Sequence, residues 1–325
     1  MHRLAALALL ATGCWPALPT SREGFACRID ADCAGGTCVA QVCTAGASGG
    51  GGGSVGDGGS SRLPLRVSFY QVGYPQAWGS GASPQTVDVA SLGRYSSTDT
   101  AVVRAHVAAL RYARIDGAVV FWGGPGSSSD VALGQVMEAA AGEPVRWAVY
   151  DQEDDGANPG VAQIRATLDA IATGVARRPN YLRLDGRPVV WVRLGAEDSA
   201  CADVNRYLDA NDAGVFLVLK VFSNYSACPR QPDGWHQYAP DTATGKHLPF
   251  STYVSPGYQT VGSSPRLARD PARFERDVRA MVDAGPQFQV ITTFNDFVAG
   301  SAVESAPAWA TDSGFGAYLD VLHAN

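Results

Sequence analysis

The sequence lacks the features that mark several large classes of protein. It has no cluster of Lys and Arg interleaved with aromatic residues, and its formal net charge is -6, so nucleic acid is not an expected partner. It has no H-E-x-x-H pair and no G-x-S-x-G elbow, which argues against zinc and serine hydrolases. The glycine-rich residues 123–129 lack the lysine of a phosphate-binding loop and predict a loop between a strand and a helix. We therefore expect no metal and no cofactor.

The first residues have the pattern of an export signal. Arg3 supplies a positive charge, and Leu4–Ala11 form an apolar run that is too short to cross a bilayer. The small residues that follow lead to Cys14 and resemble the lipobox at which bacterial lipoproteins are cleaved and acylated. We predict that residues 1–13 are a signal peptide and that the exported chain is lipid-anchored through Cys14 to a bacterial membrane, facing the periplasm or the cell exterior. Ordinary signal cleavage near this point is the alternative.

The cysteine count agrees with export. Of seven cysteines, six remain when Cys14 is set aside, and an even number suits disulfide pairing in an oxidising compartment. Four of the six lie in residues 14–43, a segment too small to build a core, which favours stapling by disulfides. Zinc is the weaker alternative, because the C-x5-C-x4-C-x4-C spacing lacks C-x2-C knuckles. The predicted disulfide cysteines are Cys27, Cys33, Cys38, Cys43, Cys201 and Cys228.

Residues 44–61 are nearly all Gly, Ser and Ala, which predicts a flexible tether. From residue 62 to residue 325, short β-branched and aromatic runs alternate with amphipathic stretches. The predicted strands are Leu65–Val72, Gly117–Trp122, Val145–Tyr150, Pro188–Leu194, Val215–Phe222, Trp235–Tyr238, Thr252–Ser255 and Gln289–Asn295.

Helical patterns lie between these strands and after the last one. They cover Thr98–Ile115, Asp130–Ala141, Pro159–Ala176, Asp198–Asn211, Asp270–Ala284 and a final stretch that ends near His323. The alternation predicts an α/β fold, a (β/α)8 TIM-type barrel over residues 62–325, in which the sixth and seventh helices are short or missing. An open, doubly wound sheet is the alternative.

Four stretches of the predicted barrel resemble the family 99 glycoside hydrolases, which are endo-acting α-mannosidases and mannanases with a barrel fold. In chain order they are IDGAVVFWGGPG at 115–126, YLRLDGRPVV at 181–190, VSPGY at 254–258 and TTFNDFVAGSAVESA at 292–306. The last resembles the family signature, roughly T-x-x-N-E-W-x-E-G-x-x-x-E. The resemblance implies a glycan substrate and an active site at the carboxyl ends of the barrel strands.

The chain departs from this family at the catalytic positions. The two catalytic Glu residues of the signature are replaced here by Asp296 and Ala299, so one carboxylate is shortened and the other is missing. Glycoside hydrolysis ordinarily needs two carboxyl groups. Asp296 is the first catalytic candidate, and Glu304, which matches the later Glu of the signature, is a candidate replacement for the missing acid. The alternative for Glu304 is a structural carboxylate that receives backbone amides or caps a helix.

An acidic run follows the third predicted strand. It includes Asp151 and Glu153, and Glu153 falls near a Glu that the family carries in a similar position. Clustered acids raise one another's pKa, which suits acid catalysis near neutral pH, so both residues are catalytic candidates. A solvated acidic loop and a Ca²⁺ site are the alternatives.

Aromatic residues follow several of the predicted strands, where a barrel presents its loops. Sugar rings stack on aromatic faces, so these residues predict a carbohydrate platform, with core packing as the alternative for each. Together with Asn295 of the signature, the predicted substrate-binding residues are Tyr74, Trp78, Trp122, Tyr238 and Tyr258.

The sequence thus predicts a monomeric, glycoside hydrolase-like surface lipoprotein that acts on an α-mannan-like or related polysaccharide. A catalytically inactive barrel that binds glycan at the cell surface is the alternative. An enzyme of another reaction class on the same scaffold also stays open, because barrels host many chemistries.

Overall fold

The structure, a computed structural model, describes residues 37–39, 42–44, 61, 63–152, 158–195 and 200–325. The chain divides into two units, Met1–Ser54 and Val55–Asn325, and the boundary falls within the predicted tether. In the first unit, β1 (Thr37–Val39) and β2 (Val42–Thr44) pair antiparallel, with Cys38 opposite Cys43. Cys14, Cys27, Cys33 and Glu153 lie outside the described residues, so the roles assigned to them stay predictions.

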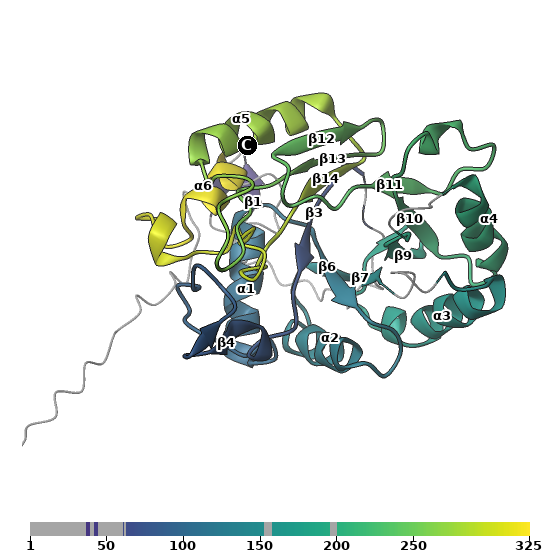
Figure 1. Cartoon of the computed structure of the whole chain (residues 1–325), viewed down its shortest axis with the longest axis horizontal. Coiled ribbons are helices and arrows are strands. Elements are labelled where there is room, and N and C mark those ends of the chain that lie inside the picture. The colour runs from purple at the N-terminus through teal and green to yellow at the C-terminus, as the bar shows by residue number, and fades with distance from the viewer. Residues whose placement is uncertain (1–36, 40–41, 45–60, 62, 153–157, 196–199) are drawn as a thin grey trace, which may run out of the picture. The chain divides into compact units, whose positions relative to one another are not determined.

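The second unit is built on a parallel sheet (Figure 1). Within the described residues, eight strands run parallel in the order β11-β10-β9-β7-β6-β3-β14-β13. They are β3 (Leu65–Tyr70), β6 (Gly117–Trp122), β7 (Arg146–Asp151), β9 (Arg187–Val192), β10 (Phe216–Lys220), β11 (Gly234–His236), β13 (Ser251–Val254) and β14 (Phe288–Ile291). Each matches one predicted strand.

The end strands β11 and β13 approach each other to within 8 Å between Cα atoms, so the sheet curls into a barrel. The predicted (β/α)8 barrel is confirmed, and the open sheet is excluded.

Short strands add to this frame. The edge strand β12 (Thr244–His247) pairs antiparallel with β13, β8 (Arg183–Leu184) forms a hairpin with β9, and β4 (Gly79–Ser80) pairs with β5 (Ser83–Pro84). None of these four strands was predicted, because a segment of two to four residues is too short to show the alternation of apolar and polar residues that indicates a strand.

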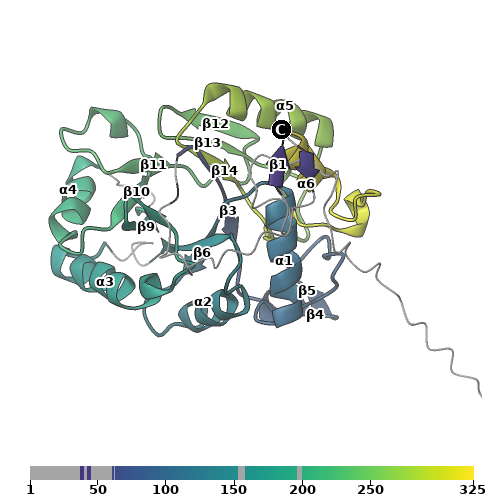
Figure 2. The same cartoon turned by 180° about the vertical axis from the view of Figure 1, so that it is seen from behind.

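Six α-helices of the described residues surround the barrel, as Figure 2 shows from behind. They are α1 (Thr100–Tyr112), α2 (Ser128–Ala139), α3 (Val161–Thr173), α4 (Cys201–Ala210), α5 (Pro271–Ala284) and α6 (Ala317–Ala324). Side-chain caps explain where three of them begin: Asp99 accepts from Ala101 N, Ser127 from Asp130 N, and Asp270 from Ala272 N. None of the helices in the described residues has the length and apolarity needed to cross a membrane.

The gap in the helix layer lies where the predicted helix ranges leave it, between Asp198–Asn211 and Asp270–Ala284, but the prediction numbered the two missing helices one position too late. The stretch between β10 and β11 contains only the 3-10 turn η4 (Tyr225–Ala227), and β12 occupies the stretch between β11 and β13. The fifth and sixth helices are therefore absent, whereas the seventh, α5, is a full helix. Pro229 and Pro232 fall between β10 and β11 and prevent a regular helix there.

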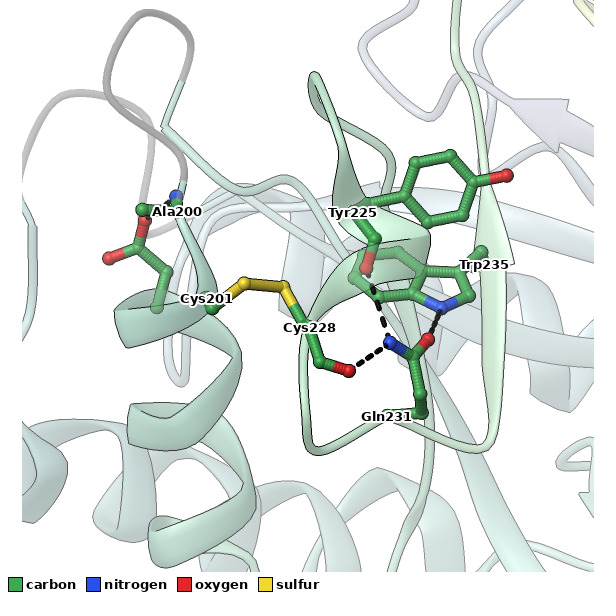
Figure 3. Close-up of a disulfide and its surroundings, with 7 residues drawn as sticks. Ala200, Cys201, Tyr225, Cys228, Gln231 and Trp235 are labelled. Carbon is green, nitrogen blue, oxygen red and sulfur yellow. Dashed lines mark hydrogen bonds between the residues drawn. A yellow bond between two sulfur atoms is a disulfide. The ribbon is translucent and has the colours of Figure 1, made fainter.

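A disulfide covers this gap and joins two of the six cysteines that were predicted to form disulfides (Figure 3). Cys201, the first residue of α4, is bonded to Cys228, which follows η4, with Cα atoms 5.3 Å apart. Beside it, the Gln231 side chain donates to the carbonyl of Cys228 at 2.8 Å and accepts from Trp235 Nε1 at 2.8 Å. The bond thus ties the irregular segment after β10 to the nearest helix.

Aromatic side chains fill the interior of the barrel. The ring of Phe69 on β3 lies 5.9 Å from that of Trp191 on β9 and 5.8 Å from that of His236 on β11, between centroids. These strands are not neighbours in the sheet, so the contacts cross the barrel. Most residues of the central strands are buried, and a functional site must lie at the ends of the strands.

Candidate functional site

A pocket of about 250 Å³ lies where the chain leaves the carboxyl ends of β3, β14 and β13, three neighbours in the sheet. Gln71 directly follows β3, Asp296 follows β14, and Tyr258 follows β13. The residues that line the pocket are Gln71, Tyr74, Ala77, Tyr258, Thr260, Asp296, Val298 and Ala299.

Asp296 is the carboxyl group among the residues that line this pocket, and it is only 5% exposed. Its Oδ1 accepts from Ala299 N at 3.0 Å, its Oδ2 from the Tyr238 hydroxyl at 3.4 Å, and the Gln71 side chain also hydrogen-bonds to it. Burial raises the pKa of Asp296, and these hydrogen bonds oppose that effect by favouring the carboxylate. A carboxyl group with a raised pKa can hold a proton for a neighbouring hydroxyl or take one from it.

Ala299 lies in the same pocket. Its backbone N–H holds Asp296, and its methyl side chain stands where the resembled signature has its second Glu. The pocket is therefore built around one carboxyl group, and the position of the missing one is occupied by an apolar surface.

Asn295 faces away from the pocket lining although it is adjacent to Asp296 in sequence. Its amide oxygen accepts from Gln71 N at 2.7 Å, its Nδ2 donates to Gln71 O at 3.0 Å, and the residue is fully buried. Asn295 thus joins the loop after β14 to the end of β3. It fixes the backbone of Gln71, whose side chain reaches Asp296.

Glu304 lies in a second, buried environment against α1. Its Oε2 accepts from the Tyr95 hydroxyl at 2.7 Å, and its Oε1 lies 3.1 Å from His106 Nε2. His106 Nδ1 in turn lies 2.7 Å from the Tyr70 hydroxyl. Burial, and then the negative charge of Glu304, raise the pKa of both Tyr70 and Tyr95. These contacts favour a structural role for Glu304, although its partners are side chains and not the backbone amides or helix end that the alternative named.

The predicted aromatic platform divides into two groups. Tyr74 and Tyr258 line the pocket, and Tyr238 contacts Asp296, so these three gather at the site. Trp78 is 1% exposed and stacks behind Tyr74 with centroids 4.2 Å apart. Trp122 is equally buried and donates from Nε1 to Asp130 of α2 at 2.9 Å. The two tryptophans therefore have structural roles in the packing of the barrel.

Asp151 ends β7 and is 3% exposed. The ring of Tyr150, one residue earlier, lies in the barrel interior, 4.9 Å from that of Phe69. Because side chains alternate along a strand, Asp151 faces the helix layer. Within the described residues, no group of three or more His, Cys, Asp and Glu side chains is placed to hold a metal ion.

Four residues of the pocket lining were not predicted from the sequence: Gln71, Ala77, Thr260 and Val298. One signal was available for Gln71: it is the polar residue directly after a buried strand, two positions beyond the inward-facing Phe69. Thr260 and Val298 lie in loops whose course the sequence does not specify.

Comparison with known proteins confirms the fold. The chain is similar to the GH99 endo-α-mannosidase from Bacteroides thetaiotaomicron, with a TM-score of 0.63 and 17% sequence identity over 81% of this chain and 97% of that one. The same enzyme in complex with bis-tris-propane gives a TM-score of 0.62 at 17% identity, over 81% of this chain and 96% of that one. A glycoside hydrolase-like protein gives 0.57 at 15% identity, over 84% and 96%. The sequence matches no family model, and no curated protein matches it. The resemblance to family 99 thus holds at the level of the barrel.

Proposed function

We propose that this chain is a glycoside hydrolase-like protein that binds a glycan in the pocket around Asp296. The observation that carries the proposal is a buried carboxyl group of raised pKa, set among tyrosines at the carboxyl ends of barrel strands. Carboxyl, amide and phenol groups can bind sugar hydroxyls, and the half-buried ring of Tyr258 can pack against the apolar side of a pyranose.

Binding is favoured over hydrolysis because, among the residues that the structure describes, Asp296 is the one carboxyl group in the pocket lining. Ala299 stands at the position of the second Glu of the signature, and Glu304 is committed to His106 and Tyr95. Hydrolysis of an α-mannan-like or related polysaccharide is the second candidate, and the raised pKa of Asp296 supports it, because an acid or base must change protonation near the working pH.

The proposal includes attachment of the chain to a bacterial membrane through a lipid on Cys14. The small residues before Cys14 support export, and the disulfide between Cys201 and Cys228 fits an oxidising compartment. The glycan site would then face the periplasm or the cell exterior.

The test is a binding and turnover screen of the full chain on neutral polysaccharides that include α-mannan. Asp296→Asn should weaken glycan binding roughly 10-fold, the scale of a hydrogen bond to a charged group. If turnover is found, the same change should lower it about 100-fold. The matched control is Asp185→Asn, an exposed position in the turn between β8 and β9, which should change neither quantity.

A gain-of-function variant separates the two candidates. Asp296→Glu combined with Ala299→Glu returns both carboxylates of the resembled signature, and new turnover on α-mannan would identify the wild type as a binding barrel. Turnover by the wild type that survives Asp296→Asn would show that another residue is catalytic. The absence of both binding and turnover on every glycan would contradict the proposed function.

A further inference from the structure

Arg269 is a largely buried cation that is not among the residues lining the pocket. It lies between β13 and α5, and only 20% of its side chain is exposed. Its guanidinium carbon lies 3.9 Å from the centroid of the Trp309 ring, and its Nη2 donates to the carbonyl of Gly300 at 3.1 Å. Burial lowers the pKa of Arg269, while Tyr318 and Asp88 favour the charged form. Because burying a charged group costs free energy, the position of Arg269 needs a physical reason.

Two loops that meet beside Arg269 contribute to the pocket. The loop after β13 and the loop after β14 supply the lining residues Tyr258, Thr260, Val298 and Ala299. The two loops are joined directly, since Gln259 N donates to the carbonyl of Ala299 at 3.0 Å. They approach most closely at Gly300, which has a φ of +61° and where an added Cβ would overlap the carbonyl oxygen of Gln259. A side chain at position 300 would therefore push the loops apart.

Arg269 adds a second connection between these loops. The loop after β13 turns back on itself, because Tyr258 N donates to the carbonyl of Leu267 at 2.8 Å. Arg269 follows two residues later and donates to Gly300 of the other loop. Its side chain also packs on the first loop, where a Cβ added to Gly257 would lie 2.5 Å from Cγ of Arg269. Arg269 thus contacts each loop within one residue of the pocket lining.

Trp309 extends the same junction towards Asp296. Its Nε1 donates to the carbonyl of Glu304 at 3.0 Å, and its ring stacks with that of Phe297, with centroids 6.4 Å apart. Phe297 directly follows Asp296 in the chain. A planar guanidinium group can stack on Trp309 and donate in its own plane at the same time, which a lysine ammonium group cannot do. The geometry therefore calls for arginine at position 269.

We propose that Arg269 is a positioning residue for the glycan site, which holds the loops after β13 and β14 together so that Tyr258 and Ala299 form one wall of the pocket. The proposal rests on the proposed function, since the wall matters for binding only if a glycan occupies the Asp296 pocket. Arg269 acts on the sugar through the two loops and not by contact.

Binding of α-mannan to the full chain tests the role of the side chain. Arg269→Met should weaken binding about tenfold, the scale of a lost hydrogen bond to a charged group. Arg269→Lys keeps the charge without the planar fork, so it should recover little of the loss. Arg279→Met removes an arginine from an exposed pair with Glu275 on α5 and should leave binding unchanged.

A double-variant cycle separates positioning from a general loss of stability. If Arg269 acts through Tyr258, then Tyr258→Ala should weaken binding less in the Arg269→Met background than in the wild type. Additive effects would contradict this. Leu168→Ala truncates a buried residue of α3, away from β13 and β14 (Figure 1). It should lower the unfolding temperature and bind α-mannan like the wild type below that temperature.

Hydrogen exchange tests the connection between the loops without any glycan. In Arg269→Met the amide of Gln259, which bonds to Ala299, should exchange roughly tenfold faster, while the amides of β6 should be unaffected. Gly300→Ala crowds the same junction and should have a similar effect. Its matched control is Gly262→Ala, because Gly262 also has a positive φ, +77°, but open space around its added Cβ. Gly262→Ala should change the exchange of Gln259 less.

The outcomes separate this proposal from the proposed function. Unchanged exchange of Gln259 in Arg269→Met would overturn the proposal, whatever the chain binds. Faster exchange with α-mannan binding equal to that of the wild type would also overturn it and leave the proposed function standing. If the wild type binds no glycan while exchange is faster in the variant, the proposed function and the role of Arg269 in binding are both wrong, and the connection between the loops stands.

Discussion

At the scale of single residues, two carboxyl groups of the same loop have different roles, and their hydrogen-bond partners show which role each has. The loop after β14 folds back on itself, since Ser301 N donates to Asp296 O at 3.0 Å and Thr293 N donates to Ser301 O at 2.9 Å. Asp296 faces the pocket, where it is held by two backbone amides and two side chains. Glu304 faces α1 and is engaged by an imidazole and a phenol. Sequence position alone made both of them catalytic candidates, and their surroundings separate them.

Glu304→Gln is expected to destabilise the fold more than it affects glycan binding. The change leaves His106 and Tyr95 with a weaker acceptor inside the protein, which should lower the free energy of unfolding by about 2–3 kcal/mol. Glu275→Gln breaks an exposed pair with Arg279 on α5 and should cost less than about 1 kcal/mol, so it serves as the control. Denaturant unfolding and α-mannan binding measure the two effects. A variant of normal stability that no longer binds glycan would restore Glu304 to the functional site.

At the scale of elements, the eight parallel strands could be predicted because they are short β-branched and aromatic runs, several of them apolar throughout and buried on both faces. Gly117–Trp122 reads Gly-Ala-Val-Val-Phe-Trp, and the structure begins and ends β6 at those residues. The segments between β10 and β13 could not be predicted as well. There the chain replaces two helices by a 3-10 turn, a disulfide and an antiparallel edge strand, none of which has a helical or strand period. The predicted helix ranges nevertheless leave this stretch without a helix, and only the numbering of the two missing helices was one position too late.

The burial of His236 on β11 should make stability depend on pH. Its pKa is lowered to about 3, chiefly by burial, so between pH 6.5 and pH 3 the unfolded chain binds a proton that the folded chain does not. Stability is therefore lost as pH falls, by about 2 kcal/mol from this residue between pH 7 and pH 5. His236→Gln keeps a donor for the carbonyl of Val192, which His236 Nε2 contacts at 3.1 Å, but does not titrate. Denaturant unfolding at both pH values should show a smaller loss in the variant, and equal losses would contradict the assignment.

The disulfide should contribute substantially to the stability of the helix-free side. Its cysteines are 27 residues apart in sequence, and closing a loop of that length in the unfolded chain corresponds to about 3.5 kcal/mol. Cys201→Ser with Cys228→Ser should lower the free energy of unfolding by that amount and shift protease cleavage towards the segment after β10. Reduction of the wild type with dithiothreitol should reproduce the loss and have no effect on the double variant. An unchanged midpoint in both experiments would show that the bond is energetically neutral.

At the scale of the whole molecule, the site depends on closure of the barrel. The signature around Asp296 could be found in the sequence because its residues are consecutive. Its partners could not: Gln71 and Tyr238 come from other strands and meet Asp296 only because β3, β14 and β11 belong to one curled sheet. Inward positions such as His236 can be assigned only once the pairing of β11 within the sheet is known. Which residues meet across a closed sheet depends on contacts between segments that are far apart in sequence. A local sequence pattern does not contain that information.

Attachment of the chain to a membrane is independent of the chemistry at Asp296. If Cys14 carries a lipid, the wild type should partition into the membrane fraction, because acyl chains and not a spanning helix provide the anchor. Cys14→Ser should release the chain while thermal unfolding and glycan binding stay unchanged, since Cys14 belongs to the unit Met1–Ser54 and the pocket belongs to Val55–Asn325. Cys228→Ser loses the disulfide and keeps Cys14, so it should remain in the membrane fraction as the control. Retention of Cys14→Ser in the membrane would contradict the lipid anchor and leave the barrel and its pocket as proposed.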